Sequence, residues 1–167
     1  MAVVLGVFVA RPYLVGTRPL LTLFIVLLVV GLAWPVTDRA ERAPAPGSAA
    51  LSLAFGIGAF GVGRLLAGGH PPVPSRLGYL VALTLAAVAE EAFFRRFVYA
   101  VLRPGGAALA IAGSTVLFAI AHVTVYGWWV LPVDLGAGLI LSWQRWSSGT
   151  WTVPAATHVI ANLLVVL

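Results

Sequence analysis

Long apolar stretches, separated by short segments rich in proline, glycine and arginine, make up almost the whole chain of 167 residues. Residues of the AVILMFWYC set account for 61% of the sequence and charged residues for only 9%, with a mean hydropathy of +1.04. Soluble domains contain about 25% charged residues. The composition therefore excludes a soluble globular protein, a disordered chain and a small secreted scaffold. It predicts an integral membrane protein.

The apolar stretches also predict how the chain is organised. A helix needs about 20 mostly apolar residues to cross a bilayer. The sequence predicts an all-α fold, a single polytopic domain over 1–167 with about six transmembrane helices that enclose a polar cavity. We expect these helices at residues 18–34, 48–67, 77–102, 107–125, 131–146 and 150–167. Residues 37–47 form the one long polar loop.

The charged residues indicate which partners to expect. All ten cations are arginine, and the net charge is +5. The arginines occur singly or in pairs, without a basic run of five or more, so we expect no nucleic-acid partner. Loop arginines that set the topology and meet anionic lipid headgroups are the simpler interpretation.

Two of the five acidic residues, Glu90 and Glu91, lie side by side in an apolar segment. An ionisable group inside a membrane costs about 2.5–3.5 kcal/mol on insertion scales, so it needs a reason to be there. Glu91 and Arg95 are four residues apart on one helical face and can form an ion pair. Glu90 points about 100° away, where alanine and phenylalanine surround it. That environment suits a general base that exchanges protons.

Two histidines lie in other predicted helices. His122 follows Phe118 by four residues, and Asn162 follows His158 by four, so the members of each pair share a helical face. His70 lies in a proline-rich segment and is interpreted as a solvated loop residue. A lone histidine could simply hydrogen-bond a neighbouring helix. Two histidines, an asparagine and a glutamate pair on three helices favour one shared site.

These side chains have the functions that amide hydrolysis requires. A carboxylate and a histidine can deprotonate water, and a second histidine and an amide can stabilise the oxyanion that forms. The sequence contains no cysteine that could serve as a nucleophile.

Three motifs in order carry a family resemblance: Glu90-Glu91-x-x-x-Arg95, Phe118-x-x-x-His122 and His158-x-x-x-Asn162. Together they resemble the CPBP intramembrane proteases, named for CAAX prenyl proteases and bacteriocin-processing proteins and also called the Abi family. The resemblance covers about residues 77–167, the part of the chain that bears the motifs.

The resemblance implies an intramembrane endopeptidase. It implies that Glu90 and His122 activate water, that His158 and Asn162 stabilise the oxyanion, and that Glu91 and Arg95 support the site. We expect a peptide or membrane-protein substrate, with lipidation an open question. Composition favours a multi-pass protein of a bacterial cytoplasmic membrane. The chain is short for this family, so we also expect further spans upstream of Met1.

A metal ion is the less favoured interpretation of the same residues. Glu90, His122 and His158 could supply a two-histidine, one-carboxylate zinc site. However, the sequence shows no further carboxylate that could orient either histidine, as metal sites usually require. We therefore expect water activation by glutamate without a cofactor.

Two other functions remain open at this point. Intramembrane glutamate and histidine residues also relay protons in transporters, although the chain is small and lacks the internal repeat of most carriers. A non-catalytic membrane scaffold or immunity protein could retain the fold. Replacing Glu90 discriminates between these possibilities, because only a scaffold should keep its cellular effect unchanged without the Glu90 carboxylate.

Overall fold

The computed structural model describes residues 18–33, 46–66 and 77–164, which are helical almost throughout and contain no strand. Within these described residues, six helical segments cross the molecule: α2 (Arg18–Ala33), α3 (Pro46–Leu66), α4 (Leu77–Glu91) with its continuation, α6 (Ala107–Tyr126), α7 (Leu131–Ser148) and α8 (Thr152–Leu164). The all-α prediction is confirmed, and each described helix begins and ends within about three residues of its predicted bounds. Pro46 and Gly47, predicted as loop, belong to α3. The other residues of that loop, and His70, lie outside the described residues.

The helix that follows residue 77 is not uniform. After α4 the chain forms a π-helix, η2 (Ala92–Val98), then one turn of α-helix, α5 (Tyr99–Leu102), and a 3₁₀ turn, η3 (Arg103–Gly105). A second 3₁₀ turn, η4 (Trp128–Val130), connects α6 to α7. The sequence analysis predicted an unbroken helix over residues 77–102, where the structure has the π-helix η2. π-helical segments are rare and occur frequently at functional sites.

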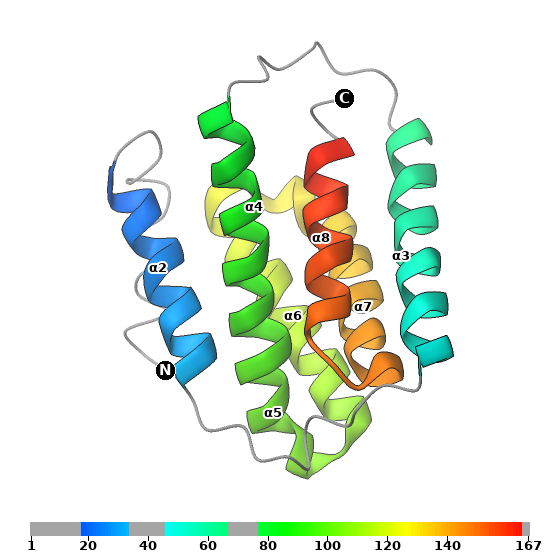
Figure 1. Ribbon diagram of the computed structural model, residues 1–167. Coiled ribbons are helices and arrows are strands. Elements are labelled where there is room, and N and C mark those ends of the chain that lie inside the picture. The colour runs from blue at the N-terminus through cyan, green and yellow to red at the C-terminus, as the bar shows by residue number, and fades with distance from the viewer. Residues whose placement is uncertain (1–17, 34–45, 67–76, 165–167) are drawn as a thin grey trace.

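The helices form one bundle in which α4 and α8 lie side by side between α2 and α3, with α6 and α7 behind them (Figure 1). In the part of the chain that the structure describes, three helical stretches are long and apolar enough to cross a membrane: Ser48–Leu66, Leu77–Gly105 and Ala107–Tyr126. The apolar helices Thr22–Ala33 and Thr152–Leu164 are shorter. Large apolar side chains such as Leu51, Phe55 and Leu65 are exposed on the outer surface of α3, as expected for a surface that contacts lipid.

The apolar core lies where α2, η2 and α6 meet. Leu23, Leu27, Phe94 and Phe118 are among its most buried members, and the rings of Phe94 and Phe118 pack edge to face with centroids 5.4 Å apart. Arg96, in η2, donates hydrogen bonds to the backbone carbonyls of Gly31 and Leu32 at the end of α2. Helix ends leave such carbonyls without intrahelical partners, so Arg96 fixes α2 against η2.

A buried polar network connects α3, α7 and α8. The amide nitrogen of Gln144 donates to the carbonyl oxygen of Ser52 (2.6 Å) and to the hydroxyl of Thr157 (2.9 Å). The hydroxyls of Ser52 and Ser147 lie 2.7 Å apart. Interhelical hydrogen bonds of this kind contribute to helix association in membranes, where apolar burial adds little. Thr157 precedes His158, so the network also determines the position of α8.

We expect Gly31→Ala to destabilise the protein strongly. A Cβ atom at Gly31 would lie 2.5 Å from the carbonyl carbon of Ala92 and 2.6 Å from its oxygen. These are backbone atoms, which cannot move aside as a flexible side chain can. Overpacking of this kind costs about 1–3 kcal/mol, to be measured as a lower thermal unfolding temperature in detergent.

Gly58 provides the matched control for this prediction. A Cβ atom at Gly58, on α3, would have no neighbour within 4 Å. Because alanine favours the helix by about 0.5–1 kcal/mol over glycine, Gly58→Ala should be neutral or slightly stabilising. Equal unfolding temperatures for the two variants would show that α2 does not pack against η2 as described.

Candidate active site

The glutamate pair lies at the end of α4, immediately before the π-helix. Glu90 is 3% exposed and Glu91 is completely buried. Arg95, also completely buried, donates a hydrogen bond from Nη1 to Glu91 Oε1 at 3.0 Å and from Nη2 to the carbonyl of Gly138 at 3.3 Å. The predicted ion pair between Glu91 and Arg95 is therefore confirmed, and Arg95 additionally connects η2 to α7.

The π-helix is tied to α7 by a second buried arginine. Arg145 donates from Nε to the carbonyl oxygen of Arg95 at 3.0 Å, and its guanidinium lies 5.1 Å from the centre of the Tyr99 ring. Arg145 is 1% exposed. The sequence analysis considered Arg145 only as a topology signal. Its place in the last turn of an apolar helix gave no indication of this contact.

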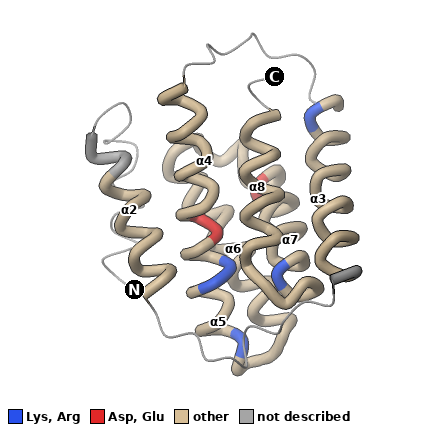
Figure 2. Tube along the Cα trace, in the orientation of Figure 1, with Lys and Arg blue, Asp and Glu red and all other residues tan. Residues whose placement is uncertain are grey.

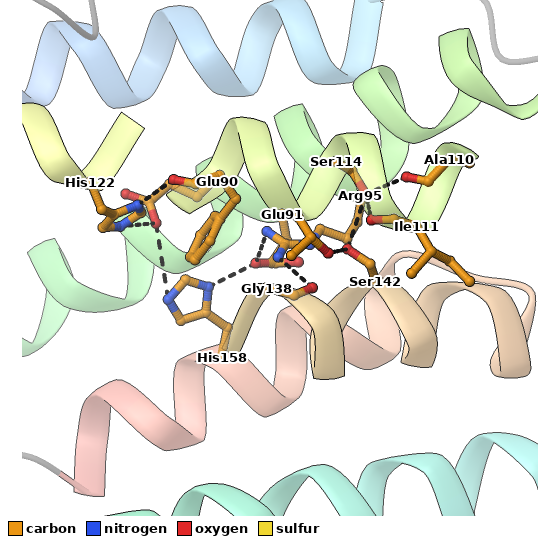
Figure 3. A network of polar contacts seen from close by, with 12 residues as sticks. Glu90, Glu91, Arg95, Ala110, Ile111, Ser114, His122, Gly138, Ser142 and His158 are labelled. Carbon is orange, nitrogen blue, oxygen red and sulfur yellow. Dashed lines mark hydrogen bonds and ion pairs between the residues drawn. The ribbon is translucent and has the colours of Figure 1, made fainter. Parts of the chain in front are cut away.

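Glu90 and the two histidines come together from α4, α6 and α8 (Figure 3). Glu90 Oε2 lies 3.6 Å from His122 Nε2 and 4.0 Å from His158 Nε2. Besides the helical neighbours expected from the sequence, both histidine rings therefore lie beside the Glu90 carboxyl group, as a shared site requires. Separations above about 3.5 Å are too long for direct hydrogen bonds but can be bridged by one water molecule.

Hydrogen bonds made by the other ring nitrogens determine the tautomer of each histidine. His122 Nδ1 lies 2.9 Å from the carbonyl oxygen of Phe118, which can only accept, so Nδ1 carries the proton. His158 Nδ1 lies 2.8 Å from Glu91 Oε1, an oxygen that also accepts from Arg95. With Glu91 ionised, that nitrogen also carries a proton. In their neutral forms both rings therefore present an Nε2 lone pair towards Glu90.

Asn162 contacts α4 directly. Its amide nitrogen donates to the carbonyl oxygen of Leu83 at 3.3 Å. An amide group has two N–H donors, so one remains for another acceptor. The pairing of Asn162 with α4 holds α8 against the helix that carries Glu90.

The polar side chains open onto a cavity of about 320 Å³. Eleven residues line it: Phe60, Phe118, His122, Tyr126, Val133, Asp134, Ala137, Leu141, His158, Ala161 and Asn162. Three of the predicted site residues (His122, His158 and Asn162) are in this wall, whereas Glu90, Glu91 and Arg95 are buried and do not line it. The sequence analysis missed Phe60, Tyr126 and Asp134. Asp134 could have been noticed as a third acid within a predicted helix.

The structure contradicts one reason given against a metal ion. Both histidines do have the hydrogen-bond acceptors that usually orient metal ligands, namely Glu91 for His158 and the Phe118 carbonyl for His122. Among the described residues, however, no three or more histidine, cysteine, aspartate or glutamate side chains are grouped closely enough to hold a metal ion.

Comparison with known families identifies the motif-bearing part of the chain. The family model for Rce1-like proteins, described as type II CAAX prenyl endopeptidase Rce1-like, matches residues 72–164, which is more than half of the chain. Searches of curated proteins and of solved structures gave no match. The matched segment contains all three motifs and every helix that supplies a polar residue to the cavity. The chain therefore belongs to the Rce1-like family of CAAX-type intramembrane proteases.

Proposed function

We propose that this protein is an endopeptidase that hydrolyses a peptide bond at the membrane with water activated by Glu90 and His122. The observation that supports this reaction best is the approach of His122 Nε2 and His158 Nε2 to the same oxygen of Glu90, at 3.6 and 4.0 Å. The Glu90 carboxylate and the Nε2 lone pair of His122 can each accept one of the two protons of a water molecule held between them. The cavity beside them leaves space for a peptide carbonyl.

The reaction would begin when the water oxygen attacks the carbonyl carbon of the substrate. One water proton passes to the Glu90 carboxylate while His122 Nε2 accepts a hydrogen bond from the other. The carbonyl oxygen becomes an oxyanion. The C–N bond then breaks as the proton held by Glu90 is transferred to the departing amine nitrogen, leaving a carboxylic acid and an amine.

We assign His158 and Asn162 to the oxyanion. Asn162 has one N–H beyond the one that it donates to Leu83. Because His158 Nδ1 donates to Glu91, donation from Nε2 requires the doubly protonated ring, for which the Glu91 carboxylate is the counter-charge. Donors positioned in advance around a developing oxyanion contribute about 100- to 1,000-fold in rate each.

The substrate that we propose is a peptide or the tail of a membrane protein, reached in a bacterial cytoplasmic membrane. Whether the substrate carries a lipid is best answered by measurement. A quenched peptide library, each sequence prepared with and without a C-terminal lipid, should be offered to the detergent-purified protein. Cleavage of any sequence would establish an endopeptidase, whereas a complete lack of cleavage would contradict this function and revive the scaffold and transporter alternatives.

We expect strong chelators to leave the cleavage rate unchanged. In the proposed reaction Glu90 takes the proton from water, so no Lewis acid is needed. The measurement compares rates before and after dialysis against a chelator, followed by addition of zinc. If this protein were instead a zinc protease, dialysis would abolish its activity and added zinc would restore it. That result would show that Glu90, His122 and His158 hold a metal.

A further inference from the structure

Asp134 is an acidic residue of the cavity wall that the proposed reaction does not use. It lies in the first turn of α7 and lines the same cavity as His122, His158 and Asn162. Apart from the Glu90–Glu91 pair, it is the only acidic residue in the part of the chain that the structure describes. Figure 2 shows these two acidic positions, one on α4 and one on α7.

Asp134 lies about one helical turn from the level of the glutamate pair. Arg95, which pairs with Glu91, also donates to the carbonyl of Gly138, and Asp134 precedes Gly138 by four residues of α7. Four helical residues correspond to about 6 Å along the axis. An extended peptide covers this distance in about two residues, so Asp134 can face a substrate side chain close to the scissile bond.

Asp134 is the one acidic residue among the described residues that line the cavity. An acid in the first turn of a helix gains about 0.3–1 kcal/mol from the helix dipole. That gain is the same whichever way the side chain points, so it does not account for a carboxylate in the cavity wall.

The side chains around Asp134 fit a long basic side chain. Val133, Ala137 and Leu141 share α7 with Asp134, and Phe60 and Ala161 complete the apolar part of the wall. Lysine and arginine place their methylene stems along apolar surface and keep only the charged head on a polar partner. A carboxylate gives that head a charge-assisted hydrogen bond, which is stronger than a neutral one.

We propose that Asp134 selects substrates with a lysine or arginine side chain within about two residues of the scissile bond. This inference rests on the proposed endopeptidase function and extends it to the class of substrate. Asp134 is thus a specificity residue, and Glu90 and the histidines act on the peptide bond itself.

The test uses pairs of peptides that differ only in lysine or its uncharged analogue norleucine, placed in turn at the two positions on either side of the scissile bond. At one position, wild-type protein should cleave the lysine peptide about 10- to 100-fold faster in kcat/KM, the range expected for a hydrogen bond to a charged group. In Asp134→Asn this ratio should fall to about one. In Asp134→Lys the preference should change to a peptide with glutamate at that position.

Two results would overturn the assignment: no position at which the wild type prefers lysine, or an Asp134→Asn variant that slows both peptides by the same factor. The second result would mean that Asp134 has only a structural function. Binding of the labelled peptides to Glu90→Gln and to Glu90→Gln with Asp134→Asn, measured by fluorescence anisotropy, keeps this test separate from catalysis. If no peptide is cleaved, the endopeptidase proposal fails, and the binding ratio of lysine to norleucine peptide still decides the function of Asp134.

Discussion

Glu90→Gln should lower the rate of peptide cleavage by about 100- to 10,000-fold, the usual contribution of a general base. Glutamine has nearly the same shape as glutamate, but its amide cannot accept the proton of the attacking water. Arg95 pairs with Glu91 at 3.0 Å, and the substitution leaves both members of that buried pair in place. We therefore expect activity to be lost without loss of the fold.

The measurement combines cleavage of a quenched peptide with thermal unfolding in the same detergent. Tyr79→Phe is a suitable control, because Tyr79 is 40% exposed in the first turns of α4 and lies outside the cavity wall. It should retain wild-type activity. An active Glu90→Gln variant would exclude Glu90 as the base, and an unfolded one would show that its carboxylate stabilises the bundle.

The helices could be predicted from the sequence because the membrane imposes strong requirements on them. Apolar stretches that cross a membrane must be about 20 residues long. Segments with proline and glycine, such as residues 103–106, mark where these stretches end. The ion pair between Glu91 and Arg95 was predictable for a similar reason, since residues four apart on a helix are neighbours. Neither prediction depends on how the helices pack together.

Features that depend on packing between helices could not be predicted. The π-helix at 92–98 has no sequence signature, and the carbonyl that it presents to Arg145 is recognised only once α7 is in place. The contact between His158 and Glu91 joins residues 67 positions apart. Its absence from the sequence analysis led to the wrong premise that neither histidine has an orienting carboxylate. Asp134 was overlooked because its distance from the glutamate pair is also set by packing.

Breaking the buried pair of Glu91 and Arg95 should have the second large effect, this time on stability. Removing one partner leaves a buried charge without compensation, which costs about 3–5 kcal/mol. Both Arg95→Met and Glu91→Leu should therefore unfold at much lower temperatures than the wild type. Arg95→Met additionally removes the hydrogen bond to Gly138.

The double variant Glu91→Leu with Arg95→Met separates folding from catalysis. Among the described residues, Glu91 Oε2 and Arg95 Nε have no hydrogen-bond partner, so the pair is incompletely satisfied. Replacing such a pair with apolar residues of similar volume is often neutral or even stabilising. We expect the double variant to regain most of the unfolding free energy that each single variant loses, measured by thermal or denaturant unfolding in detergent.

Activity should not return with stability in the double variant. His158 Nδ1 donates to Glu91 Oε1 at 2.8 Å, and leucine offers no acceptor, so the ring loses both its orientation and its counter-charge. Without that carboxylate, the ring has no acceptor to hold it at the oxyanion. A stable but inactive double variant would mean that Glu91 acts on the reaction through His158. Recovery of both properties together would mean that Glu91 serves only to neutralise Arg95.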